Sequence, residues 1–509
     1  MPVADVVVVG AGSAGCVVAA RLSEDPARSV LLLEAGPDYP EPLLPADLLD
    51  GTHGPSTDGH DWGLAGWSGP DGHGLALPRG RVTGGCSAVN ATFALRGAPA
   101  DYDAWAALGN PGWAFADVLS SFRRLETDLD HPGADHHGGD GPIPVRRYLG
   151  DARSRLTVAA GDAFSALGIP SVPDHNAPGA VGFGPLPVNT VDGRRMSTAG
   201  GYLAPARHRS NLAVRAGVLV QDVVVRAGRA VGVRLYPSGE FIRAGEVILC
   251  AGAYHSPGLL VRSGIGSADE VRALGVDVVG DLPGVGANLA DHPAVSVSGT
   301  IALPTADAPV FQLVATVHSS GSDPRRDPPD LQLLVGGPFM SPAGAGFFVG
   351  AALLKPLSRG RVRTRSVDAA APPQIDLGYF GHPADLPRLS EGVILAHRAL
   401  CTEPLRAVSA EPAPVVPAGN ALRRRIVDEA WSYHHPVGTC AMGPDPDRGA
   451  VVDADCRVHG VEGLSVVDAS VMPDIPSANT NLPTIMLAER AVARRMATER
   501  ATGDRLDRR

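Results

Sequence analysis

The stretch of sequence that decides the fold is VVVVGAGSAGCVVAARLSEDPARSVLLLE, residues 6–34. Its first four residues are valines, and such a β-branched run is typical of a strand buried on both faces. The glycine-rich segment Gly10–Gly15 then leads into an apolar helix over Cys16–Leu22, and a second strand over Val30–Leu33 ends at Glu34. These segments predict a complete β-α-β unit.

The glycines of this unit have the spacing of a dinucleotide-binding turn. Gly10 permits the tight turn, Gly12 lets the main chain touch a pyrophosphate, and Gly15 allows the helix to pack closely on the strand. The helix N-terminus stabilises phosphate charge, and Glu34 can accept hydrogen bonds from a ribose. Three spaced glycines are a weak signal in a chain with 62 glycines, but their place between a strand and a helix makes the prediction specific. The candidate cofactor-binding residues of this unit are Gly10, Gly12, Ser13, Ala14, Gly15, Glu34 and Ala35.

Composition excludes several classes of protein. Among 509 residues, 44% are hydrophobic and 19% are charged, which allows a large core and excludes general disorder. The net charge is -10 and no dense run of Lys or Arg occurs, so nucleic acid is not an expected partner. No apolar run is long enough for a membrane span, and the first residues lack the features of a signal peptide. The six cysteines include no CxxC pair, which is typical of thiols in a reducing compartment, so we expect a cytoplasmic protein.

The polar segment His131–Gly141 is a place where a metal site has to be considered. It contains His131, Asp135, His136, His137 and Asp140. No spacing within it matches a known metal-ligand geometry. We therefore interpret the segment as a mobile surface loop and predict no metal site.

Two C-terminal segments carry residues suited to acid–base chemistry. In Tyr433–Gly443, His435 stands before Pro-Val-Gly-Thr, and an imidazole on such a loop can act as a base near neutral pH. In Val466–Glu489, Asn481 lies on a loop that runs into a helix, where its amide can donate a hydrogen bond to an oxygen. Taken alone, a histidine beside a proline and an asparagine in a turn are more often structural. His434 directly precedes His435, so the residues alone leave open which of the two imidazoles acts as the base.

Together these motifs resemble the glucose–methanol–choline (GMC) oxidoreductase family over nearly the whole chain. Besides residues 10–34, the segments similar to the family are Gly84–Asn90, Gly252–Gly266, Gly284–Pro293, His435–Thr439 and Asn479–Thr484. These matches occur in the family's order, which is far more specific than any one of them.

The resemblance implies an α/β fold with two domains. One is a doubly wound, Rossmann-like domain that binds FAD, and the other is a substrate domain built on an antiparallel sheet with helices. We expect the FAD-binding domain to comprise residues 1–148, 190–296 and 430–509, and the substrate domain to comprise residues 149–189 and 297–429.

The resemblance also implies roles for single residues. His435 corresponds to the catalytic histidine, and Asn481 matches the second catalytic position, where the family has His or Asn. The further cofactor-binding residues implied are Gly85, Ser87, Asn90, Val220, Asp468 and Ala469. Val89 occupies the position at which some members carry a histidine bonded covalently to FAD. A valine cannot form that bond, so we expect noncovalent FAD.

The function implied is oxidation of a primary alcohol to an aldehyde, on a CH–OH donor. Neutral His435 accepts the hydroxyl proton, Asn481 donates a hydrogen bond to the same oxygen, and a hydride moves to flavin N5. The expected substrate is a small molecule with a hydroxymethyl group on a sugar, an amino sugar of the aminoglycoside type, or an aryl ring. Some compact members of the family act in antibiotic biosynthesis. Oxygen is the expected electron acceptor.

Other activities on the same scaffold stay open at this point. A choline-like or mycofactocin-linked dehydrogenase would pass its electrons to another carrier. A hydroxynitrile lyase would cleave cyanohydrins without net redox chemistry. A flavin-binding protein without catalysis is a further alternative.

Overall fold

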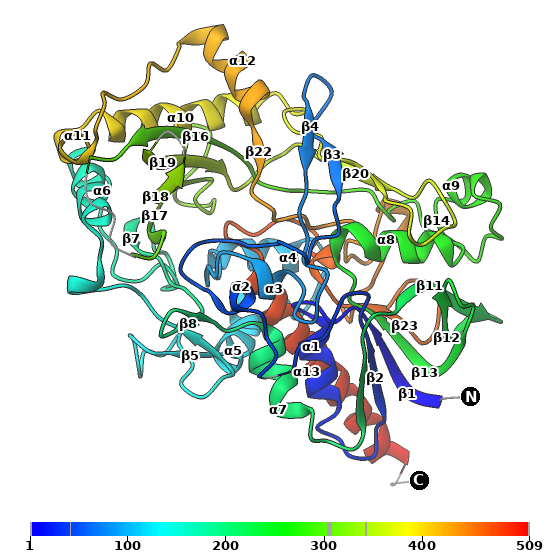
Figure 1. Cartoon of the computed structure of the whole chain (residues 1–509). Coiled ribbons are helices and arrows are strands. Elements are labelled where there is room, and N and C mark those ends of the chain that lie inside the picture. The colour runs from blue at the N-terminus through cyan, green and yellow to red at the C-terminus, as the bar shows by residue number, and fades with distance from the viewer. Residues whose placement is uncertain (1–2, 41, 303–307, 342–343, 507–509) are drawn as a thin grey trace.

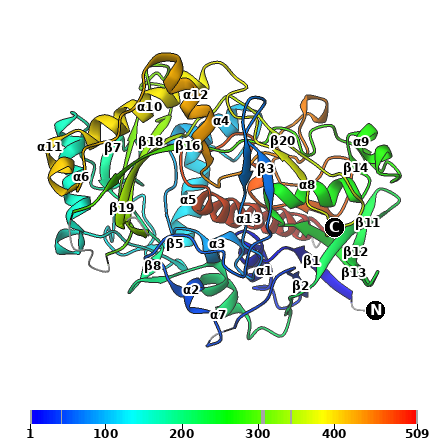
Figure 2. The same ribbon diagram turned by 45° about the horizontal axis from the view of Figure 1, so that its top comes forward.

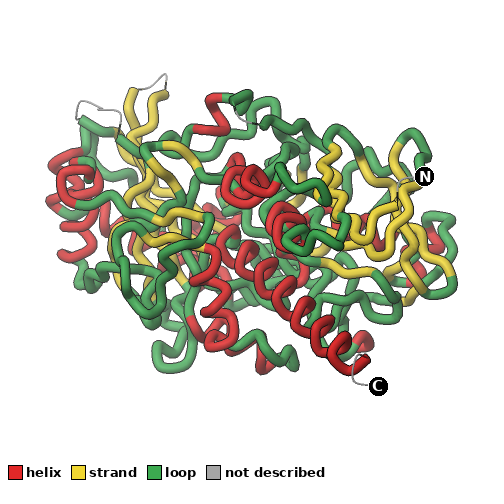
Figure 3. The backbone as a smooth tube through the Cα atoms, turned by 90° about the horizontal axis from the view of Figure 1, so that it is seen from below, coloured by secondary structure: helices red, strands yellow, loops and turns green. Residues whose placement is uncertain are grey.

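Two large β-sheets organise the chain and lie on opposite sides of the molecule (Figure 1). The computed structural model describes residues 3–40, 42–302, 308–341 and 344–506. Seen from below, the strands gather on two sides, and helices and loops fill the space between them (Figure 3). The fold is mixed α/β, as the sequence predicts.

The first sheet begins with the predicted β-α-β unit. β1 (Val3–Val9) pairs in parallel with β2 (Val30–Leu33), and α1 (Gly15–Leu22) connects the two strands. Val7 and Val8 are fully buried, because a parallel strand at the centre of a sheet is covered on both faces. The prediction drawn from residues 6–34 is confirmed.

This sheet has seven strands in the order β10–β2–β1–β13–β12–β11, and β23 also pairs with β13. The other strands are β10 (Leu212–Arg215), β11 (Leu219–Arg226), β12 (Arg229–Tyr236), β13 (Phe241–Leu249) and β23 (Leu464–Val466). β10, β2, β1, β13 and β23 pair in parallel, whereas β11 and β12 continue the sheet from β13 in antiparallel fashion. Gly10, Glu34, Ala251 and Asp468 all follow the carboxyl ends of parallel strands. Ligands of open α/β sheets bind at that edge, so these four positions mark one site.

Two helices of the first domain lie side by side although they are distant in sequence. α13 (Asn481–Leu506) packs along α1 (Figure 2). Arg21 of α1 forms an ion pair with the buried Glu489 of α13 at 2.7 Å, and the Tyr202 hydroxyl donates to the same carboxylate at 2.8 Å. This packing brings the N-terminus of α13 beside the first glycine turn.

The second sheet is antiparallel and has six strands in the order β22–β16–β19–β18–β17–β7. The strands are β7 (Gly182–Pro185), β16 (Pro293–Thr300), β17 (Phe311–Val317), β18 (Leu331–Ser341), β19 (Gly344–Leu353) and β22 (Trp431–Ser432). An antiparallel sheet as the base of the second domain confirms the expected architecture.

The two faces of this sheet have different neighbours because side chains alternate along a strand. Leu333 and Val349 belong to the hydrophobic cluster shared with α6 (Arg155–Ala166) and α10 (Asp385–Leu400). Leu334 belongs to a second cluster, which also contains Tyr433 and against which Phe348 packs. One face is therefore covered by helices, and the opposite face is directed toward the C-terminal loops.

The chain passes between the two domains several times. β7 and β17–β19 fall in the ranges expected for the substrate domain, and the strands of the first sheet fall in the ranges expected for the other. β16 begins at Pro293 and β22 begins at Trp431, inside the ranges 190–296 and 430–509 that were expected for the FAD-binding domain. Both strands pair in the substrate sheet, so we place them with the substrate domain. The domain limits are otherwise kept as a proposal.

Two expectations from composition can be compared with the described residues. Within them, no helix combines the length and the apolar composition that crossing a membrane requires. All six cysteines are free thiols, and Cys16, Cys250, Cys440 and Cys456 are buried.

The segment His131–Gly141 is anchored to the protein, so the interpretation as a mobile surface loop is wrong. His137 is buried, and its ring nitrogens lie 2.7 Å from Glu126 Oε1 and 2.9 Å from Asp174 Oδ2. Arg147 Nη2 in turn lies 2.7 Å from Asp174 Oδ1. The cluster also contains Arg96, Asp128 and His136. Several of these groups lie close enough to share an ion, but two guanidiniums already balance the carboxylates. We interpret the cluster as a structural ion network, and no metal site is proposed.

Candidate active site

A continuous cavity of about 530 Å³ joins the first glycine turn to the C-terminal loops. Its wall includes Gly10, Gly12 and Glu34 of the first domain as well as His435 and Asn479. Its volume falls in the range of small-molecule and cofactor sites. The cavity therefore connects the predicted cofactor site with the predicted catalytic loop.

Glycines are required where the loops around this cavity meet. Gly10 has a φ of 99°, in the left-handed region. A Cβ on Gly15 would lie 1.8 Å from the carbonyl oxygen of Gly10, and a Cβ on Gly85 would lie 2.6 Å from the Cα of Gly12. The turn at residues 10–15 and the loop at 84–86 therefore touch through their main chains. This leaves a cradle without side chains, as a diphosphate requires.

Glu34 lies in the wall of the cavity with its carboxylate held by the main chain. Its Oε2 accepts from the Ala11 N–H at 2.9 Å, and its Oε1 accepts from the Gly36 N–H at 2.8 Å. Burial raises the pKa of Glu34, and these hydrogen bonds oppose the rise. Ala35 also lines the cavity. Contact with a ribose stays a prediction for both residues.

Asp468 connects two segments of the cavity wall. Its Oδ2 accepts from the Gly252 N–H at 2.9 Å and from the Ser256 hydroxyl at 2.6 Å, and its Oδ1 accepts from the Ser470 N–H at 2.8 Å. The predicted residues that share the cavity wall with Asp468 are Ser13, Ala14, Gly85, Asn90, Val220 and Ala469. The residues present fit a dinucleotide, because one wall joins bare main chain, a helix N-terminus and apolar strand ends.

Two of the predicted cofactor residues lie behind the wall instead of in it. Ser87 is buried, and its hydroxyl donates to the Gly84 carbonyl at 2.6 Å and contacts the Thr198 hydroxyl at 2.9 Å. Gly15 is used for packing against Gly10. Both residues shape the cradle, and neither is among the residues that line it.

His435 lies in the cavity wall with its ring and its main chain both held. Its Nε2 is 3.1 Å from the amide nitrogen of Asn479, and its main-chain N–H donates to Asp291 at 2.8 Å. Burial holds the pKa of His435 well below its usual range, and the positive charge of Arg79 acts in the same direction. His435 is therefore neutral at physiological pH, as a general base must be.

The predicted partner of His435 has to be corrected from Asn481 to Asn479. Asn481 is the first residue of α13, and its Oδ1 accepts from the Ser13 hydroxyl at 2.8 Å. It lines the same cavity, but its amide faces the first glycine turn. Asn479, two residues earlier, directs its Nδ2 at His435. Both asparagines belong to one Asn-Thr-Asn motif, and the sequence alone did not indicate which of them precedes the helix.

The loop that carries Asn479 is anchored by buried charges. Asp101 Oδ2 accepts from the Ser477 N–H at 2.9 Å and from the Ser477 hydroxyl at 2.6 Å. Lys355 Nζ lies 3.1 Å from Asp101 and 2.6 Å from Asp474. These contacts fix the backbone on the N-terminal side of Asn479.

Aromatic side chains form the wall near His435, a feature that the sequence did not indicate. Phe311 and Phe348 from the substrate sheet, Phe93, and Trp431 and Tyr433 all line the cavity. Phe93 and Phe311 meet edge to face at 5.1 Å, and Trp431 and Tyr433 do so at 5.6 Å. Among the described residues that line the cavity, only Glu34 and Asp468 carry carboxylates, and both accept from main-chain N–H groups.

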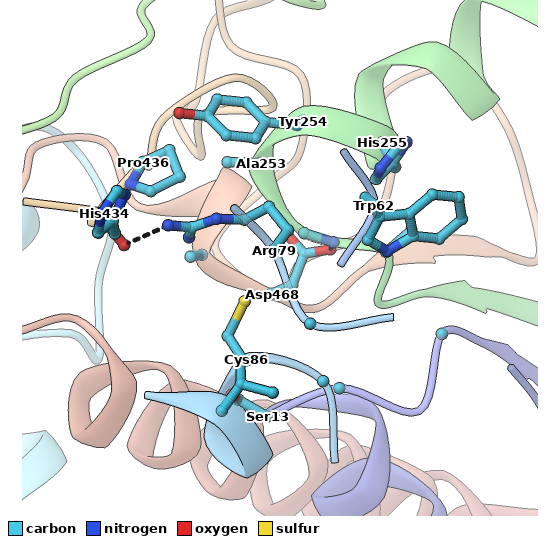
Figure 4. Close-up of a pocket in the computed structure, with 18 of the residues that line it drawn as sticks. Ser13, Trp62, Arg79, Cys86, Ala253, Tyr254, His255, His434, Pro436 and Asp468 are labelled. Atoms are coloured by element: carbon cyan, nitrogen blue, oxygen red, sulfur yellow. Dashed lines mark hydrogen bonds between the residues drawn. The ribbon is translucent and has the colours of Figure 1, made fainter. Parts of the chain in front are cut away.

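A half-buried arginine also reaches into the cavity, as Figure 4 shows. Arg79 Nη2 donates to the His434 carbonyl at 3.0 Å, and its guanidinium lies 5.7 Å from the centre of the Tyr254 ring. In Figure 4, the Cys86 sulfur points into the same space from below. Arg79 therefore places a positive charge beside the loop that carries His434 and His435.

Comparison with known proteins identifies the family. The GMC oxidoreductase models match residues 4–294 and residues 356–488 of this chain. The chain belongs to the GMC oxidoreductase family. It is 38% identical to 5-(hydroxymethyl)furfural oxidase of Methylovorus sp. (strain MP688), over 96% of this chain and 97% of that protein. It is 36% identical to the mitochondrial choline dehydrogenase of Homo sapiens, over 95% of this chain and 88% of that protein.

A solved structure agrees with this assignment. Pyridoxine 4-oxidase from Mesorbium loti superimposes with a TM-score of 0.87 and 30% identity, over 96% of this chain and 99% of that chain. As in other GMC oxidoreductases, the first domain is an FAD-binding, Rossmann-like domain and the second is a sheet-based substrate domain. The cavity lies between these two domains and takes residues from both.

Proposed function

We propose that this GMC oxidoreductase binds FAD noncovalently in the cavity and oxidises a primary alcohol to an aldehyde. The observation that carries the proposal is the His435–Asn479 pair at 3.1 Å in the wall of a cavity that the dinucleotide-binding turn also lines. Val89, in the wall of the same cavity, offers no atom for a covalent bond to a flavin.

The two side chains suit removal of a proton from an alcohol. His435 Nε2 accepts the hydroxyl proton, and Asn479 Nδ2 donates a hydrogen bond to the same oxygen as negative charge develops on it. FAD, when bound, supplies the acceptor for the hydride from the alcohol carbon. The two nitrogens lie 3.1 Å apart, so an alcohol oxygen bound beside both of them is within reach of both groups.

The aromatic wall favours an uncharged aryl alcohol over the sugars and amino sugars considered above. Phe93, Phe311, Phe348, Trp431 and Tyr433 offer flat apolar contacts. The lining carboxylates, Glu34 and Asp468, are already bonded to main-chain donors, so neither is free to balance an ammonium group. The names of two relatives support this preference, since one is an oxidase of 5-(hydroxymethyl)furfural and the other of pyridoxine.

We propose oxygen as the electron acceptor because these two relatives are named as oxidases. A choline-like dehydrogenase is the second candidate, since choline dehydrogenase is among the relatives. Aromatic rings can hold a quaternary ammonium group by cation–π attraction. The aromatic wall is therefore the structural feature that supports a choline-like dehydrogenase as the second candidate function.

An anaerobic stopped-flow experiment with the FAD-loaded protein tests the proposal. Benzyl alcohol and 5-(hydroxymethyl)furfural are expected to bleach the flavin band, and choline and glucose are expected to do so at least about tenfold less efficiently. Absence of bleaching by any alcohol would refute the function, and a preference for choline would refute the substrate class. Admission of oxygen should restore the band faster than turnover, and slow reoxidation would indicate another acceptor. Acid precipitation should release the flavin if it is noncovalent.

A further inference from the structure

A second buried imidazole, His292, lies directly behind His435. Its Nδ1 is 3.0 Å from His435 Nδ1, and the two rings meet edge to face with their centroids 5.2 Å apart. The His292 side chain is fully buried and is not among the residues that line the cavity. Its effect on a bound alcohol must therefore act through His435.

The contacts of His435 determine which of its ring nitrogens carries the proton. An amide nitrogen can only donate, so with Asn479 oriented as in the structure, His435 Nε2 is an acceptor without a proton. The neutral ring then carries its proton on Nδ1, where it donates to His292 Nδ1. This tautomer presents the basic lone pair of Nε2 to the cavity.

His292 itself stays neutral and acts as an acceptor. Burial and the positive charge of Lys355 together lower the pKa of His292 to about 3, although hydrogen bonding to the main chain at Leu354 and Pro476 opposes the shift. When His435 Nε2 takes up a proton, the ring becomes a cation, and its Nδ1–H bond to His292 becomes charge-assisted. His292 thus stabilises the protonated base without adding a negative charge.

The residue before His292 holds the main chain of the same loop. Asp291 Oδ1 accepts from the His435 N–H at 2.8 Å and from the His292 N–H at 2.9 Å, and its Oδ2 accepts from the Tyr379 hydroxyl at 2.8 Å. His434 adopts a φ of 66°, an unfavourable value for a residue with a side chain. The surrounding contacts therefore impose the conformation of this loop.

The charges around the two rings favour their neutral forms. The titratable and charged groups that face the pair are His434, Arg79, Tyr433 and Asp291 around His435, and Lys355 and Asp474 around His292. The cations Arg79 and Lys355 oppose a permanent positive charge on either imidazole. A proton taken up at Nε2 is therefore held only during the reaction.

We propose that His292 is a positioning residue, which holds His435 in the Nδ1–H tautomer and so presents Nε2 to the alcohol. This inference rests on the proposed function of His435 as the base. The proton on His435 Nδ1 needs no other acceptor, because His292 Nδ1 already accepts it at 3.0 Å.

Two substitutions at one position test the inference in the FAD-loaded enzyme. His292→Ala removes the acceptor, whereas His292→Asn keeps an acceptor oxygen near the place of Nδ1. We expect His292→Ala to lower the limiting rate of anaerobic flavin reduction by benzyl alcohol about 10- to 100-fold, with the apparent Kd for the alcohol changed less than about threefold. The acid limb of the pH profile should move to lower pH in His292→Ala, because protonated His435 loses its acceptor. His292→Asn should recover most of the rate and the original limb.

A matched control separates positioning from packing. His175 is likewise buried, with Nε2 3.1 Å from the Val314 carbonyl, and is not among the lining residues. His175→Asn should leave the pH profile unchanged. An unaltered rate and acid limb in His292→Ala would overturn the inference. So would a His292→Asn enzyme that melts like the wild type but reduces its flavin as slowly as His292→Ala.

A measurement without turnover distinguishes this inference from the function on which it rests. Nitrogen-15 NMR of labelled histidines in the resting holoenzyme should show His435 Nε2 unprotonated in the wild type and a mixture of tautomers in His292→Ala. A protonated Nε2 in the wild type would refute the tautomer assignment. If no alcohol bleaches the wild-type flavin while the NMR result holds, the proposed function fails and the positioning contact stands.

Discussion

Replacement of Asn479 by alanine, compared with the same change at Asn481, tests the assignment of the catalytic asparagine. Asn479 Nδ2 lies 3.1 Å from His435 Nε2, so it is within reach of an oxygen bound beside that nitrogen. A hydrogen bond to a charged group contributes about 1.5–3 kcal/mol. Loss of such a bond to the developing alkoxide should slow flavin reduction about 10- to 150-fold, since about 1.4 kcal/mol corresponds to a factor of ten.

Asn481→Ala should have a different effect because Asn481 bonds to Ser13. The lost hydrogen bond is between neutral groups and contributes about 0.5–1.5 kcal/mol. Its cost should therefore appear as FAD affinity weaker by about 2- to 13-fold, with a nearly normal limiting rate once FAD is saturating. Anaerobic stopped-flow reduction measures the rate, and titration of the apoprotein with FAD measures the affinity. If Asn481→Ala reduced its flavin more slowly than Asn479→Ala, the correction from Asn481 to Asn479 would be refuted.

Three further predictions address the base, the cradle and the ion network. His435→Ala should slow aldehyde formation about 10²- to 10⁴-fold with the flavin still bound, and a normal rate would remove His435 as the base. Gly15→Ala should yield colourless protein in absorbance spectra, because the new Cβ would lie 1.8 Å from the Gly10 carbonyl oxygen; full FAD content would contradict the proposed cradle. Burial alone would lower the pKa of His137, but hydrogen bonds to Asp174 and a second carboxylate raise it to about 9. Protonated His137 should therefore stabilise the folded protein fully below pH 6.5, and this contribution should be lost as the pH rises through about 9. The melting temperature of His137→Gln should lack this fall between pH 6.5 and about 9.

Much of the first domain follows from local sequence. The valines of residues 6–9 and the glycines at 10, 12 and 15 predict strand, turn and helix within one unit, and the structure folds this unit as predicted. Local sequence is enough to predict this unit because the glycines meet backbone requirements within their own turn, such as the positive φ of Gly10. The second domain and most assignments of single residues depended on the family resemblance instead.

Contacts between distant segments decided the rest. The aromatic wall collects Phe93, Phe311, Phe348 and Trp431 from four separate segments, and no local pattern links them. His137 is anchored by carboxylates from other segments, so the polarity of its own loop was misleading.

The His435–Asn479 contact shows most clearly which features came from local sequence and which from tertiary packing. The sequence by itself determined that an imidazole and an Asn-Thr-Asn motif occur near the C-terminus, each on a loop. The tertiary structure alone decided that Asn479 faces His435 while Asn481 faces Ser13. The physical reason is that α13 begins at Asn481, so two chemically identical amides two residues apart are directed to different neighbours by the packing of that helix against α1.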